Sequence, residues 1–206
     1  KSECLPNLTP EIIHKFGLTE LKRDLLLKKK LAEKMGCSDI DDYMFNHNKY
    51  YSSSKEIIVD LEKQRKLMYS KLSKYFYDDI KDLYDIKPIA EQNMDMTAYY
   101  MGPNKGNGGK GTFFINILHP EKISKYELMV LSIHEGVPGH HYENYLTYKS
   151  DKPDYIKNTL YSGYSEGWGL YCESLYEYTD KTYYYSSPYR VEKTLRLINP
   201  TPIHYY

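Results

Sequence analysis

Three of the seven histidines in this 206-residue chain fall within eight residues, at the end of a segment that is otherwise largely apolar. The segment runs over residues 128–133, and His134-Glu-Gly-Val-Pro-Gly-His-His141 follows it. Polar side chains clustered on such a helix cost free energy unless a partner satisfies them. A metal ion would do so, because imidazole nitrogens are common zinc ligands. The cluster therefore predicts a metal site, and the alternative is a buried, hydrogen-bonded group of histidines.

The spacing of these histidines requires a distorted helix. His134-Glu135 resembles the start of the HExxH motif, where histidines at i and i+4 share one helical face and the glutamate is the general base. Here position i+4 is Pro138. On a straight helix His140 would lie on the wrong side, and His141 would lie about 10 Å further along the axis. Because proline and the flanking glycines break helical geometry, we expect a bend that brings one of these two histidines to His134.

A third ligand is expected from the segment around the single tryptophan, residues 165–173. Glu166 follows His140 by 26 residues, which leaves room for a loop and an antiparallel return helix. A His/His/Glu set with water in the fourth position is typical of catalytic zinc sites. Glu173 lies seven residues after Glu166, on the same helical face. It is predicted equally well as a solvated charge or as a group that orients a ligand histidine.

Apolar periodicity predicts a mainly helical chain with one small antiparallel sheet, forming one domain over residues 1–206. The long helices at 11–35 and from 52 to about 75 carry apolar stripes that we expect to face a core. Two strands flank a Gly/Asn-rich tract, which is typical of a hairpin turn or a loop. The other predicted elements are a short helix and loop at 38–50, strands at 97–101 and 112–117 around the tract at 102–111, and helices at 123–148 and 162–179.

Composition excludes several classes of partner. Lys+Arg and Asp+Glu both number 28, so the neutral chain has no basic field to attract nucleic acid or an anionic membrane. The mean hydropathy is −0.69 and no window approaches about 18 apolar residues, which argues against a transmembrane helix. Residues 1–6 contain neither an initiator methionine nor an apolar signal region. We expect a fragment or a processed form, whose compartment and oligomeric state the residues do not assign.

The chain resembles the bacterial domain-of-unknown-function family 885, whose members are regarded as zinc-dependent peptidases of the gluzincin type. The resemblance covers nearly the whole chain and implies a gluzincin-type, zincin-like helical architecture, with this chain as the C-terminal half of a longer member. It rests on the strings at 134–141 and 166–168 and on segments 13–18, 98–100 and 111–116. It also rests on Arg196 and His204, which lie as far apart in the sequence as the late Arg and His of family members.

The resemblance implies one Zn²⁺ held by His134, His140 and Glu166. His140 is preferred because its Gly-His pair resembles the second ligand of related zincins, so that His141 would lie behind the ligands or face the substrate. Glu135 would be the general base that activates a zinc-bound water to cleave a peptide or small amide.

The resemblance also implies a substrate side of the site. The strand at 112–117 would form the edge that pairs with an extended peptide. Tyr99, Asn116 and Arg196 would bind substrate, and His204 or a nearby tyrosine would stabilise the oxyanion.

The end of the chain departs from the family. Pro200 and Pro202 stand where members usually have Asp and Gly, and the sequence stops at Tyr206. The alternative function is therefore an inactive, degenerate member that serves as a metal-binding or interaction module. A third hypothesis is hydrolysis of a non-peptide amide or ester, since the same water could attack either.

Overall fold

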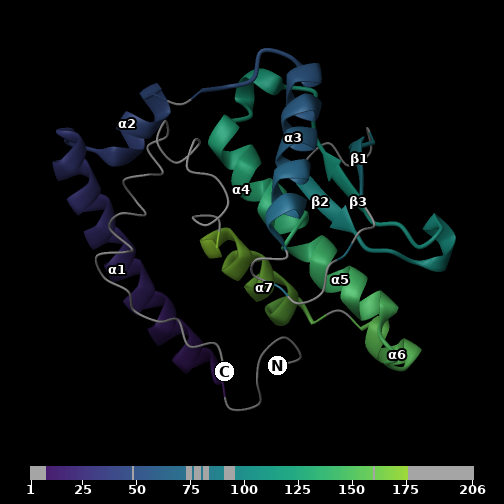
Figure 1. The fold of residues 1–206 in the computed structure, drawn as a ribbon. Coiled ribbons are helices and arrows are strands. Elements are labelled where there is room, and N and C mark those ends of the chain that lie inside the picture. Colours follow the sequence, from purple (N-terminus) through teal and green to yellow (C-terminus); the bar gives the residue numbers. More distant parts are fainter. Residues whose placement is uncertain are drawn as a thin grey trace. The chain divides into compact units, whose positions relative to one another are not determined.

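The computed structural model describes residues 8–47, 49–72, 76, 80, 84–90, 96–159 and 161–175, which form two compact units (Figure 1). The described residues up to 47 belong to one unit, and those from 49 onward belong to the other. Arg196 and His204 lie outside the described residues, as does the end of the chain at 200–206. The expectation of one domain over the whole chain stays a prediction.

The first unit consists of α1 (Pro10–Met35) and α2 (Ile40–His47). The predicted caps of α1 are confirmed: Thr9 Oγ1 accepts a hydrogen bond from the Ile12 N–H at 3.3 Å, and Gly36 ends the helix with φ 68°. The apolar stripe of α1 is not buried as predicted, since Phe16 is 61% exposed. Among the described residues, only the C-terminal end of α1 finds a small core, formed by Ala32, Met35, Cys37, Ile40 and Tyr43.

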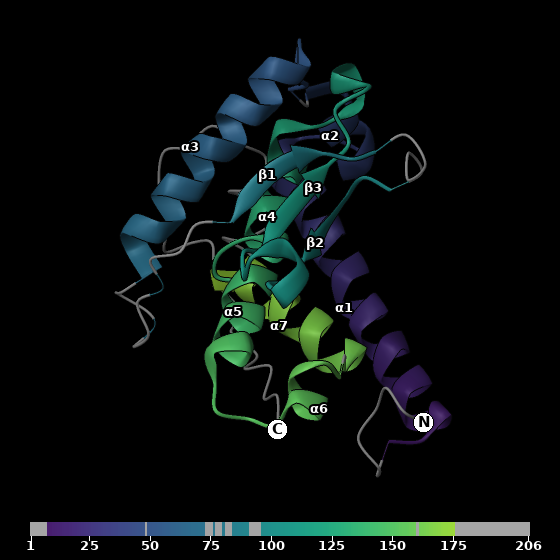
Figure 2. The ribbon, with the colours of Figure 1, turned by 90° about the vertical axis from the view of Figure 1, so that its right-hand side faces the viewer.

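The second unit begins with α3 (Ser54–Leu72), whose predicted apolar stripe is buried. It continues through the three strands to α4 (Lys125–Glu135), α5 (His140–Lys149), the one-turn α6 (Asp154–Lys157) and α7 (Ser162–Leu175). Helix α4 contacts α3, α7 and the strand β2 (Ala98–Met101), so it forms the centre of this unit (Figure 2). The core side chains include Ile57, Leu61, Phe113, Ile115, Leu128, Ile133, Val137 and Cys172.

The sheet is mixed, which corrects the predicted antiparallel sheet. Its order is β1 (Asp85–Pro88), β3 (Thr112–Ile115), β2 (Ala98–Met101), and β1 runs parallel to β3 whereas β2 runs antiparallel to it. Strand β3 is therefore central and has both sides paired. It cannot be the edge that receives a peptide, and β2 is the edge strand nearest α4 among the described residues.

The Gly/Asn-rich tract connects β2 to β3, as the sequence predicts. Asn104 and Asn107 cap each other's backbone N–H groups around a 3₁₀ turn at Lys105–Asn107. Gly108 and Gly109 follow with φ 69° and 75°, values that favour glycine.

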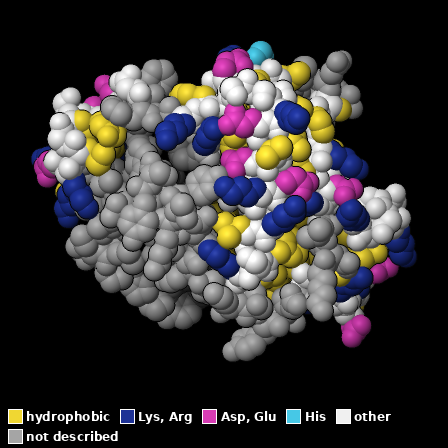
Figure 3. All heavy atoms as spheres, turned by 45° about the horizontal axis from the view of Figure 1, so that its top comes forward, with side chains coloured by type: hydrophobic (Ala, Val, Ile, Leu, Met, Phe, Trp, Pro, Cys, Tyr) yellow, Lys and Arg dark blue, Asp and Glu magenta, His cyan; other side chains and the backbone are white. Residues whose placement is uncertain are grey.

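Basic and acidic side chains of the described residues are interspersed on the face shown in Figure 3. This pattern agrees with the zero net charge of the sequence. No helix in the described part of the chain is long and apolar enough to cross a membrane.

The burial of α3 generates a prediction with an internal control. Leu61 is 1% exposed, so Leu61→Ala should lower the free energy of unfolding by about 2–5 kcal/mol through lost contacts and a cavity. Val59 lies on the same helix and is 58% exposed, so Val59→Ala should change it by no more than about 0.5 kcal/mol. Urea denaturation of both variants checks this, and equal effects would contradict the assigned core face.

Candidate metal centre

The predicted helix at 123–148 breaks where expected, at residues 136–139 between α4 and α5. The glycines serve close packing, because a Cβ on Gly139 would lie 1.9 Å from the His134 carbonyl oxygen and one on Gly136 would lie 2.4 Å from Tyr84 Oη. Their φ angles are not positive, and the Val137–Pro138 peptide bond is cis. The Gly139 N–H donates to the Ile133 carbonyl at 3.0 Å, so the chain folds back directly onto the end of α4.

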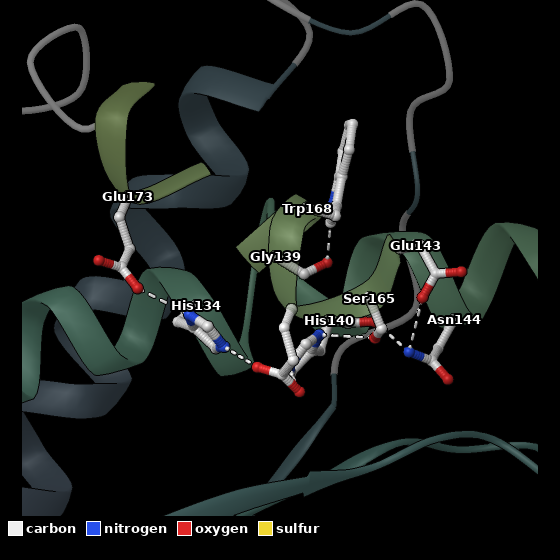
Figure 4. A network of polar contacts seen from close by, with 9 residues as sticks. His134, Gly139, His140, Glu143, Asn144, Ser165, Trp168 and Glu173 are labelled. Atoms are coloured by element: carbon white, nitrogen blue, oxygen red, sulfur yellow. Dashed lines mark hydrogen bonds and ion pairs between the residues drawn. The ribbon is translucent and has the colours of Figure 1, made fainter. Parts of the chain in front are cut away.

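Helix α7 holds this turn in place. Trp168 Nε1 donates to the carbonyl oxygen of Pro138 at 2.9 Å. It also donates to the carbonyl oxygen of Gly139 at 3.3 Å (Figure 4). Cys172 Sγ lies 3.3 Å from the Pro138 oxygen. Burial raises the pKa of the Cys172 thiol, which therefore stays protonated and can donate. The only tryptophan thus anchors the bend through its N–H group.

The bend brings His134 and His140 together. Their ring centroids are 4.7 Å apart and the rings are nearly perpendicular, at 87°. Glu166, on the first turns of α7, approaches both: its Oε2 lies 3.2 Å from His134 Nε2 and its Oε1 lies 3.6 Å from His140 Nε2. The two rings are largely buried, whereas the Glu166 side chain is 61% exposed. The two imidazole rings and the carboxylate therefore lie side by side, and the carboxylate is open to solvent.

The opposite nitrogens of both rings are also engaged. Glu173 accepts a hydrogen bond from His134 Nδ1 at 2.7 Å, and Ser165 Oγ lies 3.3 Å from His140 Nδ1 (Figure 4). The bond to Glu173 raises the pKa of His134, whereas burial lowers the pKa of His140. Such partners fix the orientation of a ring and point its free nitrogen outward. Of the two alternatives for Glu173, this contact matches a residue that orients a histidine.

Gly169 allows His134 to lie against α7. A Cβ at this position would be 2.5 Å from His134 Cε1. Glycine inside a helix costs about 1 kcal/mol relative to alanine, and at Gly169 the close approach of the His134 ring accounts for it. Neither Gly169 nor Ser165 was predicted from the sequence as part of the site.

His141 does not join His134 and His140. Its side chain is buried, with the whole residue 1% exposed, and its Nδ1 lies 2.7 Å from Tyr100 Oη on β2. The rings of Tyr69, Tyr84, Tyr100 and Tyr145 surround it at centroid distances of 4.9–6.4 Å. The structure thus separates the two adjacent histidines: His140 approaches His134, and His141 approaches β2.

Glu135 is the last residue of α4 and is 9% exposed. Its carboxylate accepts a hydrogen bond from the Tyr100 backbone N–H, and burial raises its pKa. Glu135, His134 and His140 have potential ligand atoms within 4.8 Å of one another, so Glu135 competes with Glu166 as the third member of a metal site. Two ligands bound to tetrahedral zinc at 2.0–2.1 Å are about 3.4 Å apart. Glu166 approaches this separation with a different oxygen for each imidazole: Oε2 lies 3.2 Å from His134 Nε2 and Oε1 lies 3.6 Å from His140 Nε2.

The remaining predicted residues lie in or beside the sheet. The Tyr99 ring stacks on Phe114, with centroids 4.8 Å apart. Asn116 Nδ2 donates to the Met96 carbonyl at 3.3 Å, and its Oδ1 accepts from the Leu118 N–H at 3.1 Å. These contacts give both side chains structural partners, and their role in binding substrate stays a prediction.

The family described as "Bacterial protein of unknown function (DUF885)" matches residues 1–198. The chain belongs to this family. No curated protein matches the DUF885 chain. A solved structure that resembles it is the crystal structure of the "putative lipoprotein" from Colwellia psychrerythraea, with 22% sequence identity and a TM-score of 0.76. The match covers 92% of the DUF885 chain and 34% of the Colwellia chain, so this chain spans about a third of that protein. At this identity the likeness shows a shared fold.

The two glycines of α7 predict opposite effects on stability. Gly167→Ala meets nothing within 4 Å and should raise the free energy of unfolding by up to about 1 kcal/mol through helix propensity. Gly169→Ala should lower it by about 1–3 kcal/mol, because the new methyl group displaces the His134 ring from Glu173. Thermal unfolding measures both, and NMR of the His134 imidazole reports the displacement. A stabilised Gly169→Ala variant with an unchanged His134 resonance would contradict the packing described for this ring.

Proposed function

We propose that this chain is a zinc-dependent hydrolase that cleaves peptide or small amide bonds. One observation carries the proposal: the rings of His134 and His140 lie 4.7 Å apart, and the Glu166 carboxylate approaches both, with Oε2 3.2 Å from His134 Nε2 and Oε1 3.6 Å from His140 Nε2. These distances are close to the spacing of ligands around one tetrahedral ion. Two nitrogen donors and one oxygen donor form the donor set of catalytic zinc sites. When bound, zinc lowers the pKa of a coordinated water toward about 7 and polarises a carbonyl group.

The environment of each histidine suits this role. A neutral imidazole is the form that ligates a metal, and burial lowers the pKa of His140 toward that form. His134 carries a carboxylate partner on Nδ1, an arrangement that makes the opposite nitrogen more basic. Glu166 would complete the site from a solvent-exposed position, where substrate has access.

Glu135 is suited to be the general base. Burial raises its pKa, which brings the carboxylate closer to the range in which it accepts and returns a proton near neutral pH. The Tyr100 N–H holds the carboxylate in place. Glu135 would take a proton from the attacking water and deliver it to the leaving amine.

Strand β2 offers the backbone against which a peptide could bind, in place of the predicted β3. The Asn116 N–H donates to the Thr97 carbonyl at 2.9 Å. Because backbone groups alternate between the two sides of an antiparallel strand, the register directs the backbone groups of Tyr99 and Met101 toward β3. The Tyr100 N–H points the other way, toward Glu135, and Ala98 shares that side. An extended substrate that adds to this side would pass the base and the metal site.

Two isosteric substitutions separate the metal ligand from the base. Glu166→Gln should remove most zinc binding, because it replaces an anionic ligand with a neutral amide. Glu135→Gln should retain zinc and lower kcat by about 10²–10⁴-fold, because no group remains to accept the proton. Metal analysis after dialysis and turnover of a peptide library measure these two effects.

Glu143→Gln is the matched control, since Glu143 is also a carboxylate whose pKa burial raises but its partners are Asn144 and Thr147. It should change neither zinc content nor turnover. A wild-type chain that holds zinc without hydrolysing any peptide, amide or ester would favour the inactive metal-binding module. A chain that retains no zinc would overturn the proposal, and loss of zinc in Glu135→Gln alone would exchange the roles of the two carboxylates.

A further inference from the structure

The second histidine of the pair, His141, connects α5 to the edge strand. Its Nδ1 lies 2.7 Å from Tyr100 Oη; His141 is buried and Tyr100 is half-buried. Burial raises the pKa of Tyr100, so the hydroxyl stays neutral at physiological pH. Loss of a hydrogen bond to a buried group costs stability, because water does not replace the lost partner.

The backbone of the same tyrosine connects the edge strand to α4. The Tyr100 N–H bonds the Glu135 carboxylate, while its side chain bonds His141. His141 directly follows His140, and Glu135 directly follows His134. One residue of β2 therefore joins the neighbours of both histidines of the candidate metal centre.

Packing restricts the movement of this connection. A Cβ at Gly111 would lie 1.8 Å from Tyr100 Oη, so any residue larger than glycine at position 111 would displace the hydroxyl. The His141 ring is enclosed by the tyrosine rings, of which Tyr84 is nearest with centroids 4.9 Å apart. The bond between His141 and Tyr100 thus has one favoured geometry.

We propose that His141 and the Tyr100 hydroxyl form a positioning pair that holds the Tyr100 N–H against Glu135 and so fixes the base relative to the metal ligands. This inference rests on the proposed hydrolase function. Neither group touches the reacting atoms, and each acts through the backbone of β2. Misplacing a reacting group by about 1 Å can lower the rate about 10²-fold. The hydrogen bond between His141 and Tyr100 should therefore affect turnover.

Amide exchange tests the pair without requiring turnover. In His141→Leu, hydrogen exchange at the Tyr100 N–H, followed by NMR, should be about 10-fold faster than in the wild-type chain. His141→Asn keeps a polar group near the position of Nδ1 and should restore part of the protection. Tyr84→Phe is the matched control: it removes the hydroxyl of a buried tyrosine whose ring packs against His141, and it should leave exchange at Tyr100 unchanged.

Kinetics then separate positioning from general destabilisation. Tyr100→Phe and His141→Leu should each lower kcat about 10-fold, with KM and zinc content retained, whereas Tyr84→Phe should retain kcat. If the wild-type chain shows no turnover, the proposed function fails, and the exchange measurement still decides whether the positioning pair holds the Tyr100 N–H. Unchanged Tyr100 exchange in His141→Leu, or equal kcat losses in Tyr84→Phe and Tyr100→Phe, would overturn the positioning pair.

Discussion

The turn that brings His134 and His140 together is held by contacts to the carbonyl oxygen of Pro138. Trp168 and Cys172 both approach this oxygen from α7, and together they hold the turn between α4 and α5 against that helix. Without the turn, α4 and α5 would continue as one helix and carry the two histidines to different sides. The same helix supplies Glu166 and Glu173. The bend and its acidic neighbours are therefore stabilised by one packing interaction.

The surroundings shift the pKa of each ionisable group of the site in a different way. Glu173 raises the pKa of His134, whereas burial lowers the pKa of His140 and raises that of Glu135. The negative carboxylates of this site repel one another, and a divalent cation between them and the neutral imidazoles would offset that repulsion. This electrostatic argument and the convergent geometry support the same function, and the DUF885 assignment alone names no activity.

Local signals in the sequence predicted most helices, and long-range contacts explain what it missed. Thr9, Pro10 and Gly36 define α1, and Pro138 marks the break before α5. Strand β1 was missed because four residues that end in Pro88 carry little strand pattern and pair in parallel with a distant strand. The apolar period of α1 predicted a buried face, but periodicity identifies a stripe without showing what covers it.

For the site, motif spacing indicated His134, Glu135 and Glu166 but left His140 and His141 equivalent, because the path of a distorted turn depends on tertiary contacts. Locating the ion tests the zinc hypothesis. The most direct measurement is anomalous diffraction at the zinc edge from crystals of the zinc-loaded chain. The account predicts one peak about 2.0–2.2 Å from His134 Nε2, His140 Nε2 and a Glu166 oxygen. A peak coordinated by His141, or no peak beside His134, would contradict it.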